Sequence, residues 1–256
     1  MPEEVRQIFK RVEKKYLLES EEFNQLRGIM SDYMQKDIYD KYTICNVYYD
    51  TEDFELIRTS IEKPVYKEKF RVRSYGVPSD NDLAFLEIKK KYRGVVYKRR
   101  IPGSYLVIKQ LLQIITDDSI ECKDDMYRQL ELFNGGSNMQ IIHEIEYIIK
   151  HYRLYPETYI AYDRIAFSGI DDPELRITFD QNIRTRRDNL TLSAGDYGDL
   201  LLDEGLYLME IKSNGAMPIW LVNALSDMHI YPYSFSKYGN DYDYKRRLQE
   251  AVAEEY

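Results

Sequence analysis

The feature that most constrains the fold of this chain is an alternation of charged and apolar residues with a period of two. In residues 65–75, four basic residues share one parity, and aromatic and aliphatic residues take the other. Because side chains alternate across a strand, such a segment has one basic face and one apolar face. Eight strands are predicted in this way, at about 9–19, 42–50, 65–75, 82–92, 94–101, 157–167, 174–187 and 206–213.

The polar faces of these strands are strongly basic, although the whole chain carries a net charge of −8. They hold thirteen basic residues, namely Arg11, Lys15, Lys67, Lys69, Arg71, Arg73, Lys89, Lys91, Lys98, Arg100, Arg164, Arg176 and Lys212. They hold four carboxylates, namely Glu13, Glu87, Asp180 and Glu210. A half-solvated sheet with a charged outer face predicts mixed signs, because adjacent like charges repel. We therefore favour basic faces that line a lumen and apolar faces that lie under helices.

Helices are predicted between the strands, at 20–34, 104–115, 123–133, 138–152 and 217–228 and from about 241 onwards. Ser20 is the expected N-cap of the first helix, and the pair Gly135-Gly136 is a stop signal for the third. The turn Tyr92-Arg93-Gly94 predicts a hairpin. No linker or repeat divides the chain, which predicts a single domain over residues 1–256. The expected fold is α+β, an eight-stranded antiparallel closed β-barrel with helices packed on its outside, and ferredoxin-like or sandwich arrangements stay open.

Composition excludes several classes of protein. No apolar run approaches the roughly 18 residues of a membrane span, and the charged N-terminal residues do not form a secretory signal. Two cysteines in a chain of this length indicate a reducing, cytoplasmic location. The acidic net charge argues against nucleic acid as a partner. His143 and His151 match no zinc motif, and the chain has no P-loop, dinucleotide-binding or protein-kinase motif.

Lysines and arginines that converge from several strands are what a polyphosphate chain with its metal ion requires. One arginine can bind two phosphate oxygens at once, and lysine places a single positive charge at the end of a flexible side chain. A carboxylate among them assists an anion only through a hard cation, so Mg²⁺ or Mn²⁺ is predicted to bridge Glu210 and phosphate oxygens. Asp180 is a weaker second candidate for the metal, with a role in a turn as the alternative. Glu87 is predicted to form a salt bridge.

Seven pieces of the sequence, in order, resemble the vacuolar transporter chaperone (VTC) domain of polyphosphate polymerases, within the CYTH-like triphosphate tunnel metalloenzymes. They are KKYLL (14–18), FRVRSYG (70–76), FLEIKKKYRGVVYKRR (85–100), YDRIAF (162–167), LRITFDQNIRTRR (175–187), YLMEIKS (207–213) and SFSKYG (234–239). The chain departs from the family at two places. Only Glu13 and Lys15 fit the superfamily's E-x-E-x-K, and Ser234 stands where family members often have a further lysine.

The resemblance implies a tunnel in which polyphosphate is built from the γ-phosphate of ATP, with Mn²⁺ preferred. The residues that it implies bind phosphate are Lys15, Arg71, Arg73, Lys89, Lys98, Tyr162, Arg164, Arg176, Ser236 and Lys237. It implies that Glu210 is the metal ligand and that Lys237, with Arg71 and Arg73, assists the transfer. No membrane helix is encoded, so coupling to translocation implies a separate membrane protein as partner.

Two other functions stay open at this point. One is a metal-dependent tripolyphosphatase or nucleoside triphosphatase, and the other is a polyphosphate-binding accessory subunit without activity. Whichever of the three functions holds, Arg71→Ala and Arg73→Ala are expected to weaken triphosphate binding and slightly stabilise the fold without ligand, because each relieves crowding of like charges.

Overall fold

The computed structural model describes residues 11–38, 40–120, 123–132 and 138–254. All eight predicted strands are present in this part of the chain, with ends shifted by at most a few residues. Two short strands, β2 and β9, were not predicted, because two or three residues are too few to show an alternation. The strands are β1 (Arg11–Leu18), β2 (Met34–Lys36), β3 (Tyr42–Asp50), β4 (Tyr66–Tyr75), β5 (Leu83–Tyr92), β6 (Val95–Ser104), β7 (Tyr155–Gly169), β8 (Arg176–Arg186), β9 (Asp199–Leu200) and β10 (Tyr207–Asn214).

The strands form an antiparallel sheet. Hydrogen-bonded neighbours follow the order β1-β10-β8-β7-β3-β4-β5-β6, and β2 and β9 pair beside this path with β7 and β8. The hairpin predicted at Arg93-Gly94 joins β5 and β6, and both turn residues have the positive φ that such a tight turn requires (47° and 85°). The described residues hold ten strands instead of eight, and they contain no pairing of β6 with β1. These pairings therefore confirm an α+β fold on an antiparallel sheet, and they do not confirm a closed eight-stranded barrel.

The helices agree with the prediction in place and differ at several ends. They are α1 (Ser20–Met30), α2 (Glu55–Ile61), α3 (Tyr105–Thr116), α4 (Asp124–Leu132), α5 (Met139–Tyr152), α6 (Ile219–Asp227) and α7 (Lys237–Glu254), with a short 3₁₀ turn at Leu192–Ala194. The helix predicted over 20–34 ends at Met30, because residues 31–33 form a turn and Met34 begins β2, which pairs with β7. Its N-cap is Glu19 and not Ser20, and a capping box with Glu22 satisfies the first turn. The predicted stop at Gly135-Gly136 lies outside the described residues.

Two further differences concern α2 and α7. The seven-residue helix α2 was not predicted, because it is too short to show a helical period. Helix α7 begins at Lys237 instead of near residue 241, so Lys237 is the first residue of a helix and does not lie in the loop before it. The first turns of α7 are also less exposed than predicted, since Tyr238 and Asp241 are buried.

The chain forms two compact units. The first unit takes its residues from 1–42, 162–183 and 202–235, and the second takes them from 43–161, 184–201 and 236–256. The predicted single domain over residues 1–256 stays a prediction, for which one cooperative unfolding transition is the expected signature.

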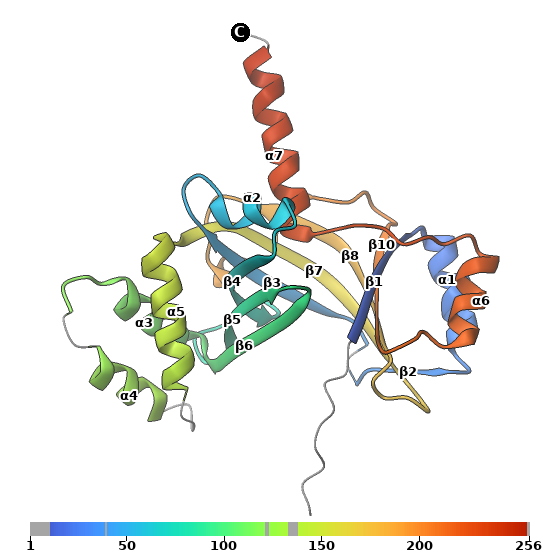
Figure 1. Cartoon of the computed structure of the whole chain (residues 1–256), viewed down its shortest axis with the longest axis horizontal. Coiled ribbons are helices and arrows are strands. Elements are labelled where there is room, and N and C mark those ends of the chain that lie inside the picture. The colour runs from blue at the N-terminus through green and yellow to red at the C-terminus, as the bar shows by residue number, and fades with distance from the viewer. Residues whose placement is uncertain (1–10, 39, 121–122, 133–137, 255–256) are drawn as a thin grey trace, which may run out of the picture. The chain divides into compact units, whose positions relative to one another are not determined.

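In the first unit, the apolar faces of β1, β8 and β10 form a core under helices α1 and α6, whose labels mark them in Figure 1. Tyr16 of β1, Phe179 of β8 and Met209 of β10 are almost fully buried there. Phe23 of α1 packs edge-on against Phe179, at 4.9 Å between ring centroids. The prediction that helix 20–34 covers an apolar strand face is confirmed for α1.

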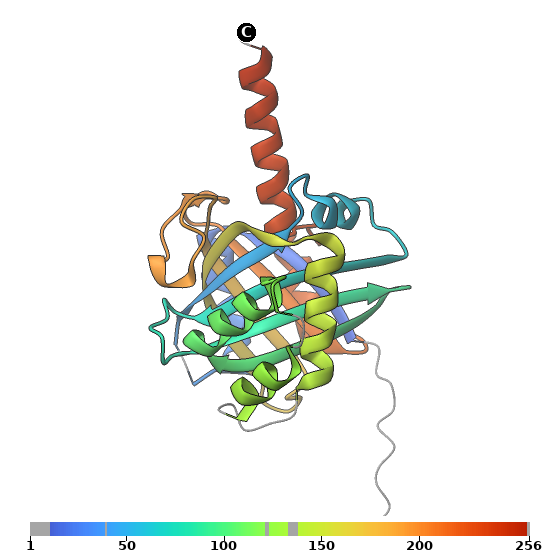
Figure 2. The same cartoon turned by 90° about the vertical axis from the view of Figure 1, so that its left-hand side faces the viewer.

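In the second unit, the apolar faces of β4, β5 and β6 form a core with α3, α4 and α5, which lie in front of these strands in Figure 2. Phe70, Leu86 and Ile101 come from the three strands, and all are at most 3% exposed. The helices predicted at 104–115 and 138–152 therefore also cover an apolar face, as expected. Burial of these faces leaves the residues of the other parity on the opposite side of the strands.

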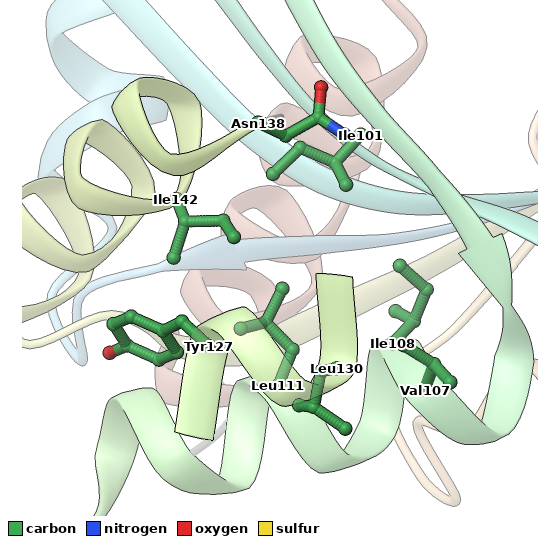
Figure 3. Close-up of a pocket in the computed structure, with 8 residues that line it drawn as sticks. All are labelled: Ile101, Val107, Ile108, Leu111, Tyr127, Leu130, Asn138 and Ile142. Carbon is green, nitrogen blue, oxygen red and sulfur yellow. The ribbon is translucent and has the colours of Figure 1, made fainter. Parts of the chain in front are cut away.

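A small cavity lies between β6 and helices α3, α4 and α5, and its lining is shown in Figure 3. Its lining residues are Ile101, Val107, Ile108, Leu111, Tyr127, Leu130, Asn138 and Ile142. A volume of about 10 Å³ is no larger than one water molecule needs. This cavity is therefore a feature of core packing and not a substrate site. Across the described residues, no helix combines the length and apolar character that crossing a membrane would require.

Candidate phosphate-binding site

The pairing of β4, β5 and β6 in the second unit brings lysines directly opposite one another. Lys69 of β4 pairs with Lys89 of β5, and Lys89 pairs with Lys98 of β6. Lys67 pairs with Lys91 two positions further along, on the same face. Directly opposed like charges destabilise a sheet, so the position of Lys89 between two other lysines favours the binding of an anion there.

Glu87 is the acidic residue that these basic strands surround. Its side chain is only 2% exposed. Oε2 accepts a hydrogen bond from Arg71 Nε (2.8 Å) and forms an ion pair with an Nη atom of the same arginine at 2.7 Å. Arg73 Nε lies 3.6 Å from the same oxygen, and Lys98 Nζ lies 3.0 Å from Oε1. The predicted salt-bridge role of Glu87 is confirmed. One carboxylate is therefore shared by three cations, and the group carries a net charge of +2.

Two side chains of β3 accept hydrogen bonds from Arg71 and Arg73. Arg71 donates to the hydroxyl of Tyr48 (2.8 Å) and lies over its ring, while Arg73 Nε donates to Asn46 Oδ1 (2.9 Å). Neither partner was predicted as a site residue. Their common parity in strand 42–50 was visible in the sequence, but the pairing of Asn46 with Arg73 and of Tyr48 with Arg71 depends on the register between the strands.

The charge of Glu87 is stabilised by its surroundings. Burial alone would raise the pKa of this carboxyl, but Arg71, Arg73 and Lys98 more than offset that effect and lower the pKa of Glu87 to about 2. Burial lowers the pKa of Lys98, and the neighbouring Glu87 opposes this shift. The carboxylate is therefore ionised throughout the physiological range, and it attracts both arginines by its charge and holds Arg71 by a hydrogen bond as well.

This geometry overturns one expectation. Arg71→Ala and Arg73→Ala were expected to stabilise the fold without ligand by relieving like-charge crowding. Both arginines instead pair with the buried Glu87, so removing either one leaves that carboxylate with less compensation. Loss of one partner from a buried ion pair is destabilising. The crowding argument applies instead to Lys89, which is exposed and forms no ion pair in the part of the chain that the structure describes.

Ser236 and Lys237 lie at the start of α7, in the same unit. The hydroxyl of Ser236 accepts from the backbone N–H of Gly239 (3.2 Å), which caps the helix, and from Lys69 Nζ at 3.4 Å. Lys237 is the first residue of the helix and is partly buried. The structure therefore brings the predicted Ser236–Lys237 pair to the basic strand β4, through Lys69.

The remaining predicted residues belong to the first unit. Lys15 of β1 pairs directly with Glu210 of β10; its Nζ lies 3.9 Å from the Glu210 carboxylate and donates to the carbonyl of Phe235 (2.8 Å). Lys212 forms an ion pair with the same carboxylate. Glu210 is therefore placed between two lysines.

Arg164 forms a closely matched pair with Asp180 in the first unit. Nε and an Nη atom of Arg164 donate to the two carboxylate oxygens at 2.6 and 2.8 Å, and the guanidinium lies 5.2 Å from the centre of the Tyr162 ring. Arg176 is more exposed and pairs with Asp37 at 3.6 Å. Lys15, Arg164 and Arg176 thus all have an acidic partner in this unit.

The two units differ in charge balance. The polar faces of β4, β5 and β6 carry eight of the predicted basic residues and one carboxylate, Glu87. In the first unit, the described side chains include four of the predicted basic residues, each with a nearby acid, and three carboxylates. Arg11, the thirteenth basic residue, has a side chain that is not among those the structure describes. The excess of positive charge predicted from the sequence is therefore concentrated in the second unit.

A metal site built from protein groups alone is not present in the described residues, which contain no group of three or more His, Cys, Asp and Glu side chains arranged for a metal. Asp180, the weaker candidate, has both oxygens bound by Arg164. Glu210 is a single carboxylate, which fits a hard cation only if phosphate oxygens and water supply the other ligands. Mg²⁺ is commonly held in this way, by one or two carboxylates and a substrate phosphate.

Comparison with known proteins gave a family match and several distant structural likenesses. No curated protein matches the sequence. Among solved structures, a candidate adenylate cyclase from Vibrio parahaemolyticus aligns with 12% identity and a TM-score of 0.42, over 90% of this chain and 96% of that one. A candidate adenylyl cyclase from Hippeastrum, described as having a dominant triphosphatase activity, aligns with 14% identity and a TM-score of 0.47, over 90% and 93%.

The Mediator head module of Schizosaccharomyces pombe also aligns, with 6% identity and a TM-score of 0.38, over 86% of this chain and 90% of that one. At TM-scores below 0.5, these three likenesses assign nothing to this chain.

The comparison with family models gives a stronger result. The model of the VTC domain matches residues 10–244, which is nearly the whole sequence. The chain therefore belongs to the VTC domain family.

Proposed function

We propose that this chain is a polyphosphate polymerase, which transfers the γ-phosphoryl group of ATP to the end of a polyphosphate chain. In this reaction the bond between the γ-phosphorus and its bridging oxygen breaks, a terminal oxygen of the polyphosphate forms the new bond, and ADP leaves. Membership of the VTC domain family supports the substrate class. A phosphoryl transfer of this kind depends mainly on positioning and on charge stabilisation.

The observation that carries the proposal is the row Lys69, Lys89 and Lys98 beside the cluster of Arg71, Arg73 and Glu87. A phosphate chain is a linear array of negative charges, and it would offset the repulsion between the opposed lysines. The arginines are held in fixed directions by Glu87, Tyr48 and Asn46, so they are organised before a ligand binds. Side chains that are already fixed lose little conformational freedom when a phosphate binds.

In the first unit, we assign phosphate binding to Lys15, Arg164 and Arg176 and cation binding to Glu210. Tyr162 supports Arg164 through its ring. A bound Mn²⁺ or Mg²⁺ would supply a further positive charge to the phosphate oxygens. Without that ion, Glu210 pairs with Lys15 and Lys212, so this chain's own residues hold the carboxylate in place until a ligand arrives.

The proposal is tested by incubating the purified protein with ATP and either Mn²⁺ or Mg²⁺ and following the length of the product by gel electrophoresis. Growth of a polyphosphate ladder together with release of ADP is the expected result. Release of inorganic phosphate without a polymer would instead identify a tripolyphosphatase or nucleoside triphosphatase. Tight binding of tripolyphosphate without turnover would identify an accessory subunit.

A pair of adjacent lysines tests whether the basic face binds phosphate. Lys89→Met is expected to weaken tripolyphosphate binding about tenfold and to raise the free energy of unfolding without ligand by up to about 1 kcal/mol, because it removes the central charge of the lysine row. Lys90→Met is the matched control, since Lys90 lies on the other face and pairs with Glu144 at 2.7 Å. The control is expected to lose stability and to keep its affinity.

Titration calorimetry and chemical denaturation measure both quantities for these two variants. Equal loss of affinity in Lys89→Met and Lys90→Met would contradict binding at the basic face. A closed tunnel of eight strands, a cytoplasmic location and a separate membrane protein as partner remain predictions.

A further inference from the structure

The start of α7 is connected to Arg71 by a continuous series of contacts. The hydroxyl of Tyr238, the second residue of the helix, donates to Asp50 Oδ2 at 2.8 Å. The ring of Tyr238 stacks on that of Tyr48, with 4.8 Å between centroids and 21° between planes. The hydroxyl of Tyr48 accepts from Arg71. Tyr238 therefore contacts a residue that holds one of the proposed phosphate-binding arginines.

Asp50 is a rigid anchor for this arrangement. It is fully buried at the end of β3, and three backbone N–H groups also donate to its carboxylate. Those donors are Thr51 (2.9 Å) and Leu56 (2.8 Å) to Oδ1 and Ile57 (3.0 Å) to Oδ2. With the hydroxyl of Tyr238, the carboxylate accepts four hydrogen bonds, so neither of its oxygens can move without breaking one.

A second anchor holds α7 one turn further on. Asp241 is 2% exposed and accepts from the hydroxyls of Thr185 (2.6 Å) and Thr158 (3.2 Å), and it forms an ion pair with Arg187. Residues three apart lie on the same side of a helix, so Tyr238 and Asp241 fix the same face of α7. The residues just before this face, Ser236 and Lys237, are thereby fixed as well.

We infer that Tyr238 and Asp50 are positioning residues, which hold Arg71 and the Ser236–Lys237 pair in a set arrangement for the phosphoryl group. This inference rests on the proposed function. The hydroxyl of Tyr238 ties the helix to β3, and its ring ties the helix to the arginine through Tyr48. A displacement of about 1 Å in such an arrangement is enough to reduce the rate of a reaction strongly, whereas overall charge attraction to the ligand changes little.

The test compares Tyr238→Phe with Tyr127→Phe. The first variant removes the hydroxyl and keeps the ring that stacks on Tyr48. The second removes a hydroxyl from an equally buried tyrosine of α4, which lies at the apolar cavity of the same unit. Tyr238→Phe is expected to lower kcat for polymer formation about tenfold, with KM for ATP within about twofold, and to speed amide hydrogen exchange at Gly239 and Asn240. Tyr127→Phe is expected to leave kcat, KM and exchange in α7 unchanged.

The outcomes test the positioning role of Tyr238 independently of the proposed polymerase activity. A kcat for Tyr238→Phe within twofold of that for Tyr127→Phe overturns the inference, even if both are less stable than the parent protein. If the parent protein makes no polymer, the proposed function fails, and the protection of the Gly239 and Asn240 amides from hydrogen exchange by bound tripolyphosphate takes the place of kcat. Protection that is lost in Tyr238→Phe alone would then support positioning, and equal protection in both variants would overturn it.

Discussion

Replacing Glu87 with glutamine is expected to lower the free energy of unfolding by about 3 kcal/mol at low ionic strength. The substitution keeps the shape of the side chain but removes the negative charge that Arg71, Arg73 and Lys98 share. Three cations then remain around a nearly buried position without a counter-ion. The loss is measured by chemical denaturation of the two proteins side by side.

Tripolyphosphate is expected to restore much of this stability, because it supplies the missing negative charge. The melting temperature of Glu87→Gln should therefore rise more on addition of tripolyphosphate than that of the parent protein does. Glu68→Gln is the matched control: Glu68 is also buried on β4, but it lies on the opposite face and pairs with Lys90 (3.8 Å). An equal rise in Glu68→Gln would mean that the ligand does not bind at the Glu87 cluster.

Acid is expected to destabilise the protein through the same carboxylate. The pKa of Glu87 is lowered in the folded protein from 4.5 to about 2, so unfolding raises its affinity for protons. The stability that ionised Glu87 contributes is fully present above pH 4.5 and is lost as the pH falls toward 2. A shift of this size corresponds to about 3 kcal/mol, which matches the loss expected for the neutral glutamine.

This pH dependence is isolated by subtracting the unfolding free energy of Glu87→Gln from that of the parent protein at each pH between 6 and 2. Other acidic groups titrate in both proteins and cancel in the difference. The difference should be about 3 kcal/mol at pH 6 and should approach zero near pH 2. A difference that stays constant over this range would show that the charge of Glu87 does not stabilise the fold.

The strands and the two kinds of strand face could be predicted from the sequence because they depend on neighbours along the chain. The alternation in residues 65–75 placed Arg71 on a face opposite to Phe70, and the turn at Arg93-Gly94 carried its own signal in the residues that permit positive φ. Short elements such as α2 and β2 could not be predicted, because they contain less than two periods of any pattern.

The partners of each charge could be decided only by the tertiary structure. Parity shows that Glu87 and Lys89 share a face, but only the register shows that Glu87 lies against Arg71, and that Lys89 lies between two lysines. The alternation in the sequence does not show which of the thirteen basic residues have an acidic partner. The fold pairs Arg164 with Asp180 and places Lys89 directly between Lys69 and Lys98, because register depends on turns and core packing that no local pattern records.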